Sequence, residues 1–205
     1  MENKVGGEWY STWFDSPFYH ILYQHRNHEE AEEAVKHLLD FAGVTKGSVV
    51  MDLCCGKGRH SVLLEKAGNI VTGLDLSPAN IAHCKSFENN HLHFDVHDIP
   101  LESNRFDVLF CNHVMEHVDD PIQCMKEFYR VMKPGAWAIM QVPQDMSREL
   151  TYEDSSITTP EQREIHFWQY DHVRLFGRDY PQWLEKAGFQ VDVFDIKQHY
   201  TPEQI

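Results

Sequence analysis

The stretch 49–60 constrains the fold of this chain more than any other segment. An apolar run leads to Asp52 and then directly into a turn that contains Gly56 and Gly58. Glycine reaches positive φ at no steric cost and has no Cβ, so backbone N–H groups in such a turn can approach a ligand at the start of the next helix. The order of residues predicts a strand, a tight turn and a helix, with the turn as a ligand platform.

A second apolar run, Ile70 to Leu74, ends in Asp75. This acid follows Gly58 by 17 residues, the spacing at which the second strand of a βαβ unit delivers a carboxylate to a ribose diol. A Walker loop needs Lys followed by Ser or Thr, and a dinucleotide loop needs G-x-G-x-x-G; the chain has neither here. The turn and the acid together indicate a cofactor site of another type. A βαβ turn without a ligand is the alternative.

These residues resemble motif I and the following acidic motif of the class I S-adenosylmethionine-dependent methyltransferases. In that family an acidic residue is followed by x-G-x-G-x-G, and here Cys54 stands at the first glycine. The resemblance implies an α/β fold: a Rossmann-like, doubly wound, mostly parallel sheet with helices on both faces and an N-terminal helical cap. It implies S-adenosylmethionine as the cofactor and S-adenosylhomocysteine as the product. The cofactor-binding residues that it implies are Asp52, Cys54, Gly56, Gly58, His60, Asp75, Leu76, Asp95, Val96 and Asn112.

The segment His91–Pro100 resembles the D-A-x-x-L-P segment of the same family. Aligned in that way, Asp95 would accept a hydrogen bond from the adenine N6 amino group, and the Val96 N–H would donate to the ring. Asp98 is the second candidate for the amino group. An acidic turn without a ligand is the alternative.

An almost continuous apolar run, Phe106–Cys111, predicts a strand that is buried on both faces. Its carboxyl end points to the crevice where open α/β sheets bind ligands. The residues that follow resemble the E-H-V-x-D-P segment of the ubiquinone-biosynthesis and related small-molecule methyltransferases. That alignment puts Asn112 beside the cofactor and turns His113 and His117 toward the substrate. These two histidines are therefore the predicted catalytic residues.

The same stretch reads H-x-x-E-H, which is also the inverted zinc-protease signature. Its place directly after a fourth strand argues against a protease. Some relatives hold a divalent metal with E-x-x-E-H at this position, so His113, Glu116 and His117 are candidates for a metal site or a general base. A helix-capping glutamate with solvent-facing histidines is the alternative, and no metal is predicted.

Two regions outside the core are expected to form the substrate side. The aromatic N-terminal segment carries Tyr19 and Tyr23, and one or both of them are expected to face the site, because so many large rings would otherwise be exposed. The long polar stretch 143–176 is predicted to be a functional loop. A solvated loop with incidental histidines is the alternative. The candidates for contacting an acidic or hydroxylated substrate are His166, Asp171, His172 and Arg174.

A length of 205 residues with 42% hydrophobic content is consistent with a single methyltransferase domain. Its predicted parts are a helical cap over 1–43, a cofactor-binding core over 48–142, a substrate-side segment over 143–176, and a C-terminal helix and strand over 177–205. The last strand is predicted over Phe189–Ile196. The fold normally adds a seventh strand, but residues 197–205 show no strand pattern. Either the sheet is one strand short or the chain lacks its C-terminal end.

The formal net charge of -14 disfavours a long nucleic-acid interface, since such binding draws its affinity from Lys and Arg. A small-molecule substrate is expected, without a nucleic-acid partner. Five scattered cysteines show no disulfide framework, and neither a signal peptide nor a membrane-spanning run is present, so a cytoplasmic protein is predicted. The oligomeric state is open.

The predicted function is S-adenosylmethionine-dependent methyl transfer to an O, N or C nucleophile of a small molecule. One alternative is an S-adenosylmethionine-binding protein that transfers no methyl group. The other is an RNA methyltransferase, which the acidic balance opposes.

Overall fold

The computed structural model describes residues 28–84, 90–93 and 95–193. The chain divides into two compact units: the first comprises residues 1–114 and 130–141, and the second comprises residues 115–129 and 142–205. Tyr19 and Tyr23, which the sequence places on the substrate side, lie outside the described residues.

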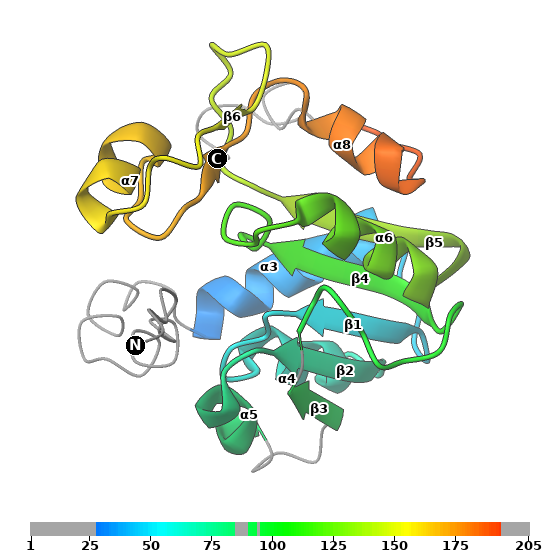
Figure 1. The fold of residues 1–205 in the computed structure, drawn as a ribbon. Helices are drawn as coiled ribbons and strands as arrows, with labels where there is room; N and C mark the ends of the chain where they lie inside the picture. Colours follow the sequence, from blue (N-terminus) through cyan, green and yellow to red (C-terminus); the bar gives the residue numbers. More distant parts are fainter. Residues whose placement is uncertain (1–27, 85–89, 94, 194–205) are drawn as a thin grey trace. The chain divides into compact units, whose positions relative to one another are not determined.

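The first unit is built on a five-stranded sheet of order β3-β2-β1-β4-β5 (Figure 1). Its four strand pairs are all parallel. The order reverses between β1 and β4, and ligands of open α/β sheets bind at such a switch point, outside the carboxyl ends of the strands. The predicted α/β class is confirmed. The strands are β1 Val49–Leu53, β2 Ile70–Asp75, β3 Asn90–His93, β4 Phe106–Asn112 and β5 Met132–Gln141.

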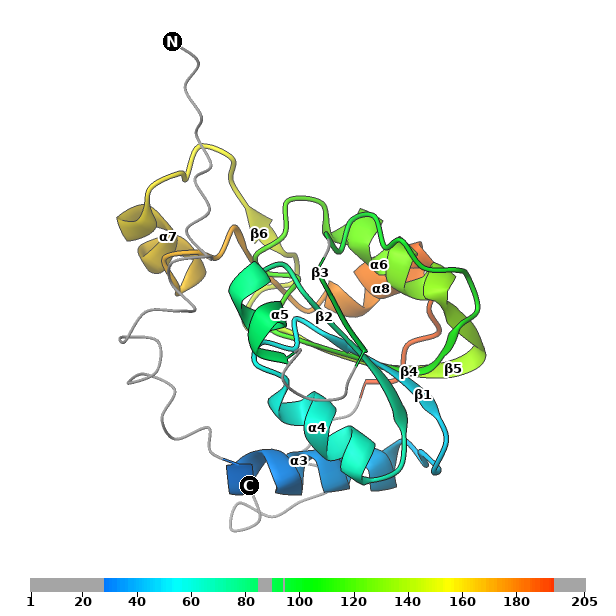
Figure 2. The ribbon, with the colours of Figure 1, turned by 90° about the horizontal axis from the view of Figure 1, so that it is seen from below.

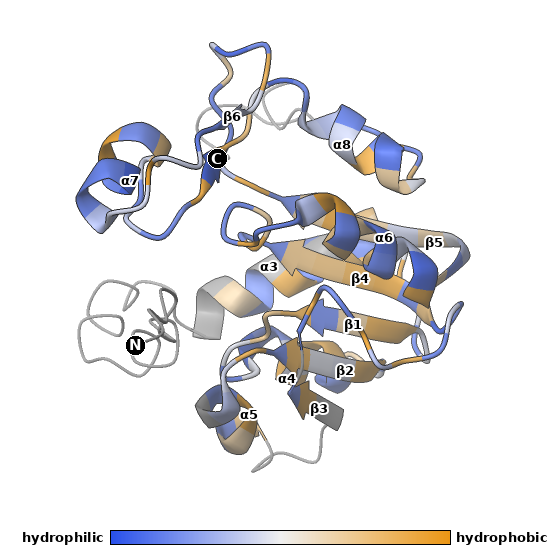
Figure 3. Cartoon of the chain, viewed as in Figure 1, coloured by the Kyte–Doolittle hydropathy of each residue, from blue (hydrophilic) through white to orange (hydrophobic). Residues whose placement is uncertain are grey.

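The core of the first unit lies between the sheet and two helices, α3 (His28–Phe41) and α4 (Arg59–Lys66). These helices lie side by side in Figure 2, and β1 and β4 are largely apolar in Figure 3. Apolar residues recur at helical spacing between His28 and Phe41, which predicts an amphipathic helix ahead of the first strand, and α3 confirms it. A third helix, α5 (Pro78–Cys84), packs against β2 and β3. The buried cluster consists of Ala31, Val35, Val50, Leu63, Leu64, Val71, Val108 and Phe110.

Strand β5 begins earlier than the sequence predicts. The Pro134-Gly135 pair predicts a turn before a strand at Ala136, but Met132 already pairs with Phe106, directly after helix α6 (Pro121–Val131). The register then shifts, and Gly135 adopts a left-handed φ of 78° within the irregularity. A bulge thus accommodates the turn residues inside the strand.

The second unit contains most of α6 and a set of short elements. Strands β6 and β7 pair antiparallel. Side chains of Ile157, Phe167 and Leu175 form a buried cluster in this unit. The remaining elements are β6 Tyr152–Glu153, α7 Pro160–Phe167, β7 Arg174–Leu175 and α8 Tyr180–Ala187.

The polar composition of 143–176 predicts a loop, but α7 forms within it, so that prediction is wrong for this part. Thr159 caps the helix: its side chain accepts from the Gln162 N–H, and the Gln162 side chain accepts from the Thr159 N–H. Pro160 is well suited to the first turn. Phe167 is the only buried residue of α7, so the helix lacks the periodic apolar face by which helices are recognised in sequences.

The strand predicted over Phe189–Ile196 is not formed in its described part, residues 189–193. Gly188 ends α8 with a φ of 112°, and the Phe189 N–H donates to the Leu184 carbonyl. The Phe189 ring packs edge-on against Tyr129 at a centroid distance of 5.2 Å. Phe189 therefore closes a helix end. In the described part of the chain, no helix has the length and apolar character of a membrane span.

Candidate functional site

The turn after β1 is left-handed at three positions. Cys54, Gly56 and Gly58 have φ values of 52°, 56° and 78°. Gly58 is the N-cap of α4, so the turn leads directly into a helix N-terminus, where backbone N–H groups attract anionic and polar ligand atoms. A Cβ added at Gly56 would meet no atom within 4 Å. Buried Asp52 accepts a hydrogen bond of 2.6 Å from Ser61 Oγ and ties β1 to α4.

Asp75, the last residue of β2, lies against this turn. Its Oδ2 accepts from the Gly56 N–H at 2.9 Å, and its Oδ1 accepts from the Ser77 N–H at 2.7 Å and from Asn80 Nδ2 at 3.2 Å. Burial raises the pKa of Asp75 and outweighs the opposing effect of these hydrogen bonds. The acid that sequence spacing singled out therefore adjoins the glycine turn.

The predicted adenine residues lie in the turn after β3. Asp95 is exposed, and its Oδ1 accepts from the His97 N–H at 2.9 Å and lies 2.6 Å from His97 Nδ1. Partial burial raises the pKa of Asp95, but the bonds from His97 outweigh it and the net pKa is lowered. Val96 and His60 are half-buried, and Leu76 is exposed. Contacts of these residues with a cofactor remain a prediction.

At the end of β4, Asn112 is half-buried and pairs with Gln141 of β5. The next residue, His113, is exposed and has a left-handed φ of 57°, while its N–H donates to the Gln141 carbonyl at 2.8 Å. The backbone thus turns at His113, at the carboxyl edge of the sheet.

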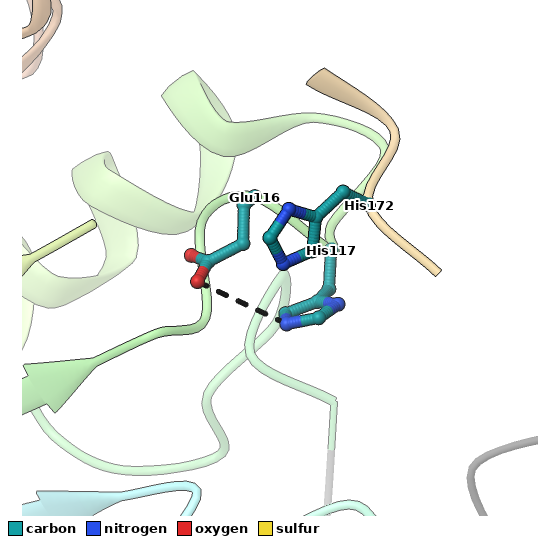
Figure 4. Close-up of side chains that lie close together, drawn as sticks. All are labelled: Glu116, His117 and His172. Carbon is teal, nitrogen blue, oxygen red and sulfur yellow. Dashed lines mark ion pairs between the residues drawn. The ribbon is translucent and has the colours of Figure 1, made fainter. Parts of the chain in front are cut away.

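In the second unit, Glu116, His117 and His172 lie close together, and one nitrogen of His117 faces the Glu116 carboxylate (Figure 4). One candidate ligand atom from each lies within 4.8 Å of the others. His117 Nε2 is 3.9 Å from Glu116 Oε1, and His117 Nδ1 is 3.5 Å from Asp171 Oδ2. The two rings meet edge to face at 4.8 Å between centroids. Residues far apart in sequence thus form one cluster.

The cluster is largely buried, and the tautomer of one ring follows from its partner. Glu116 is 1% exposed, and Asp171 and His172 are each 5% exposed. Burial lowers the pKa of His172, and neighbouring His117 lowers it further, so the ring is neutral at pH 7. Its Nδ1 lies 3.0 Å from the Phe167 carbonyl, which can only accept, so Nδ1 carries the proton and Nε2 keeps its lone pair.

Arg174 holds the backbone around this cluster. Its Nη1 donates to the carbonyls of Met115 (2.7 Å) and Val118, and its Nη2 donates to that of Asp119 (3.1 Å). The guanidinium is 3% exposed and also pairs with Glu153 through Nε at 2.5 Å. Through these bonds Arg174 positions the backbone of residues 115–119. The contact of Arg174 with substrate stays a prediction.

The remaining candidate of the substrate segment, His166, stands apart from the cluster. It is exposed on α7, and its Nδ1 lies 3.2 Å from the Tyr152 hydroxyl. The structure places two carboxylates, those of Glu116 and Asp171, beside the histidines, and both are buried. The H-x-x-E-H pattern pointed to Glu116, but no local signal joined it to His172.

A family model described as a methyltransferase domain matches residues 51–140, from β1 to the end of β5. The predicted resemblance to class I S-adenosylmethionine-dependent methyltransferases is confirmed. The demethylmenaquinone methyltransferase of Staphylococcus epidermidis is 29% identical to this methyltransferase-like chain over 169 residues. The match covers 75% of this chain and 66% of the relative, so the chain spans just under two thirds of that protein.

Solved structures show the same fold. A SAM-dependent methyltransferase from Archaeoglobus fulgidus aligns with a TM-score of 0.62 and 16% identity, covering 85% of this chain and 75% of that one. The cyclase SpnF aligns with a TM-score of 0.61 and 17% identity, covering 78% of this chain and 59% of that one. At these identities the likeness is one of fold. Family and fold together support S-adenosylmethionine as the cofactor, as the sequence predicts.

Proposed function

We propose that this chain is an enzyme that transfers a methyl group from S-adenosylmethionine to an O, N or C nucleophile of a small molecule. The observation that carries the proposal is the hydrogen bond between the Gly56 N–H and the Asp75 carboxylate, 2.9 Å long, which joins the glycine turn to the acid of β2. A nucleoside cofactor of this fold needs both features side by side.

The Asp75 carboxylate has few hydrogen-bond acceptor positions left for the hydroxyls of a ribose. A carboxylate oxygen accepts about two hydrogen bonds. Oδ1 already accepts from Ser77 and Asn80, whereas among the described residues Oδ2 accepts only from Gly56. We therefore infer that one ribose hydroxyl bonds to Oδ2, and that a second would displace the Asn80 amide, whose bond of 3.2 Å is the longest of the three.

The other cofactor contacts follow the alignment with the family. Asp95 and the Val96 N–H are proposed for the adenine edge. Asp52, His60 and Leu76 are proposed to line the nucleoside. Cys54, Gly56, Gly58 and Asn112 are proposed for the methionine end.

S-adenosylmethionine supplies a methyl group that its sulfonium already activates, so the protein mainly positions the nucleophile. His113 and His117 are the proposed bases for an acceptor hydroxyl, since a neutral imidazole can remove a proton near pH 7. A His113→Ala, His117→Ala double variant with full activity would exclude this role. In that case positioning alone would account for the rate.

A small organic acceptor is proposed for two reasons. The relatives are named for demethylmenaquinone, a small molecule. The net charge of -14 also opposes a nucleic-acid substrate. The described cysteines are all free thiols, which supports a reducing compartment such as the cytoplasm.

The experiment combines purified full chain, S-adenosylmethionine and a fractionated metabolite extract, with S-adenosylhomocysteine release as the readout. We expect at least one fraction to stimulate release by the wild type and not by Asp75→Ala. Equal stimulation of both proteins would show that Asp75 does not hold the cofactor. Stimulation by RNA rather than by small molecules would favour an RNA methyltransferase.

A second candidate is cofactor binding without methyl transfer. A protein of this fold, the cyclase SpnF, is named for a ring-forming reaction, so the fold by itself does not fix the reaction. Calorimetry would then detect S-adenosylmethionine binding, while no fraction would stimulate release of S-adenosylhomocysteine. The two readouts together separate the candidates.

A further inference from the structure

We propose that Glu116, His117 and His172 bind a divalent transition-metal ion such as Zn²⁺ or Co²⁺. The cluster lies wholly within the second unit, and two imidazoles with one carboxylate are a donor set typical of such ions. The hard ions Mg²⁺ and Ca²⁺ prefer all-oxygen ligands, so they fit this donor set less well. Three protein ligands leave a coordination position for water or an oxygen atom of a substrate.

The distances fit an ion after a small adjustment. A tetrahedral ion with bonds of about 2.1 Å has its ligand atoms about 3.4 Å apart. Here His117 Nε2 and Glu116 Oε1 are 3.9 Å apart, and the whole set lies within 4.8 Å. Side-chain rotations that move each ligand atom by a few tenths of an ångström up to about 1 Å would bring the three atoms to the distances of a bound ion.

The His172 imidazole is oriented as metal-ligating imidazoles usually are, and the His117 imidazole lies near a second carboxylate. A ligating histidine commonly donates its other N–H to a carbonyl or carboxylate, which fixes the tautomer. His172 Nδ1 donates to the Phe167 carbonyl at 3.0 Å, and His117 Nδ1 lies 3.5 Å from the Asp171 carboxylate. His172 Nε2 is therefore the atom left for an ion, and His117 Nε2 is the ring nitrogen that lies 3.9 Å from the Glu116 carboxylate.

The surrounding backbone holds the ligands in place. The Val173 N–H donates to the Glu116 carbonyl at 2.9 Å, which fastens the segment next to His172 to the other two ligands. Arg174 binds the carbonyls of Met115, Val118 and Asp119. Such a framework reduces the ordering that ion binding would otherwise require.

Charge points the same way. Two carboxylates, Glu116 and Asp171, are buried at this position, and buried charges in proteins are paired or coordinate metals. The Arg174 guanidinium, the nearest buried cation, is already paired with Glu153. A divalent cation would balance both carboxylates. His117 would then be a metal ligand instead of a catalytic base.

Titration of the chelator-treated full chain with Co²⁺, followed by visible absorption, tests the proposal without any need for methyl transfer. We expect a single ion per chain with the intense bands of low-coordinate Co²⁺, and competition by Zn²⁺. Glu116→Gln and His117→Ala should each weaken binding by more than about 10-fold, and Asp171→Asn by about 10-fold. His37→Ala, which removes an exposed histidine of α3, serves as the matched control and should bind as the wild type does.

Near-ultraviolet circular dichroism would establish that each variant is folded; half-buried His117 tolerates truncation better than His172. The proposal is overturned if the wild type binds no Co²⁺, or if folded Glu116→Gln and His117→Ala variants bind it as tightly as the wild type. Cofactor binding is measured separately, so failure here would leave the proposed methyl transfer untouched.

Discussion

The glycine turn and the histidine cluster are assembled in opposite ways. The turn is one contiguous stretch, and the acid that closes it comes from the next strand along the chain, through a single hydrogen bond from Gly56 to Asp75. The cluster joins residues 116–117 to residue 172 through backbone and guanidinium contacts. Local sequence is therefore sufficient to find the first site, whereas the second depends on tertiary structure.

Replacement of Arg174, which supports the backbone of the cluster, should have the largest effect on stability among the changes proposed. Arg174→Ala leaves the buried carbonyls of Met115 and Val118 without their donor, so we expect unfolding to become easier by about 3 kcal/mol in urea titrations. Co²⁺ affinity should fall as well, because the ligand backbone loses its support. Arg178→Ala is the control: this exposed residue pairs with exposed Glu149, and its removal should change stability by about 0.5 kcal/mol or less. Equal effects of the two variants would refute the positioning role.

The sequence predicted most of the first unit because its signals are local. The periodic face of α3 and the apolar runs of β1, β2 and β4 were each sufficient to find those elements. The start of β5 could not be predicted, because pairing of Met132 with Phe106 overrides the Pro134-Gly135 signal. A capping box begins α7, but the helix has a single buried residue. It therefore lacks the periodic apolar face by which a helix is predicted from sequence.

The same contrast between local sequence signals and tertiary structure applies to the site residues. Spacing placed Asp75 beside the glycine turn, and the structure agrees. Spacing gave no reason to join His172 to Glu116, because 55 residues separate His172 from His117 and only the fold brings them together.

Cys54 tests the turn itself. A non-glycine residue at a φ of 52° is strained by about 1 kcal/mol, and the family pattern has glycine here. Cys54→Gly should therefore raise the free energy of unfolding by about 0.5 kcal/mol, once the greater entropy of unfolded glycine is subtracted. Cys54→Ala keeps the Cβ and controls for the thiol, so it should show no gain. A gain in the alanine variant equal to that of the glycine variant would mean that backbone strain is absent.

The smallest expected effect on stability concerns Asp107, near the amino end of β4. A hydrogen bond from Lys133, 2.7 Å long, lowers the pKa of Asp107, and the Val49 N–H contributes further. A lowered carboxyl pKa stabilises the fold above the unfolded value of about 3.9, and the contribution is lost as pH falls through the folded value. Because the pair is over a third exposed, we expect about 0.5 kcal/mol. Urea titrations between pH 3 and pH 7 should show this extra loss at low pH in the wild type and not in Asp107→Asn.

Calorimetric titration with S-adenosylmethionine tests the central claim most directly, through two isosteric variants of sheet carboxylates. Asp75 ends β2 beside the glycine turn, and Asp107 lies near the amino end of β4. We predict that Asp75→Asn weakens binding by at least about 10-fold, the equivalent of one charge-assisted hydrogen bond, and that Asp107→Asn binds as the wild type does. Equal affinity of all three proteins would contradict the assignment of the cofactor site to the junction of Gly56 and Asp75.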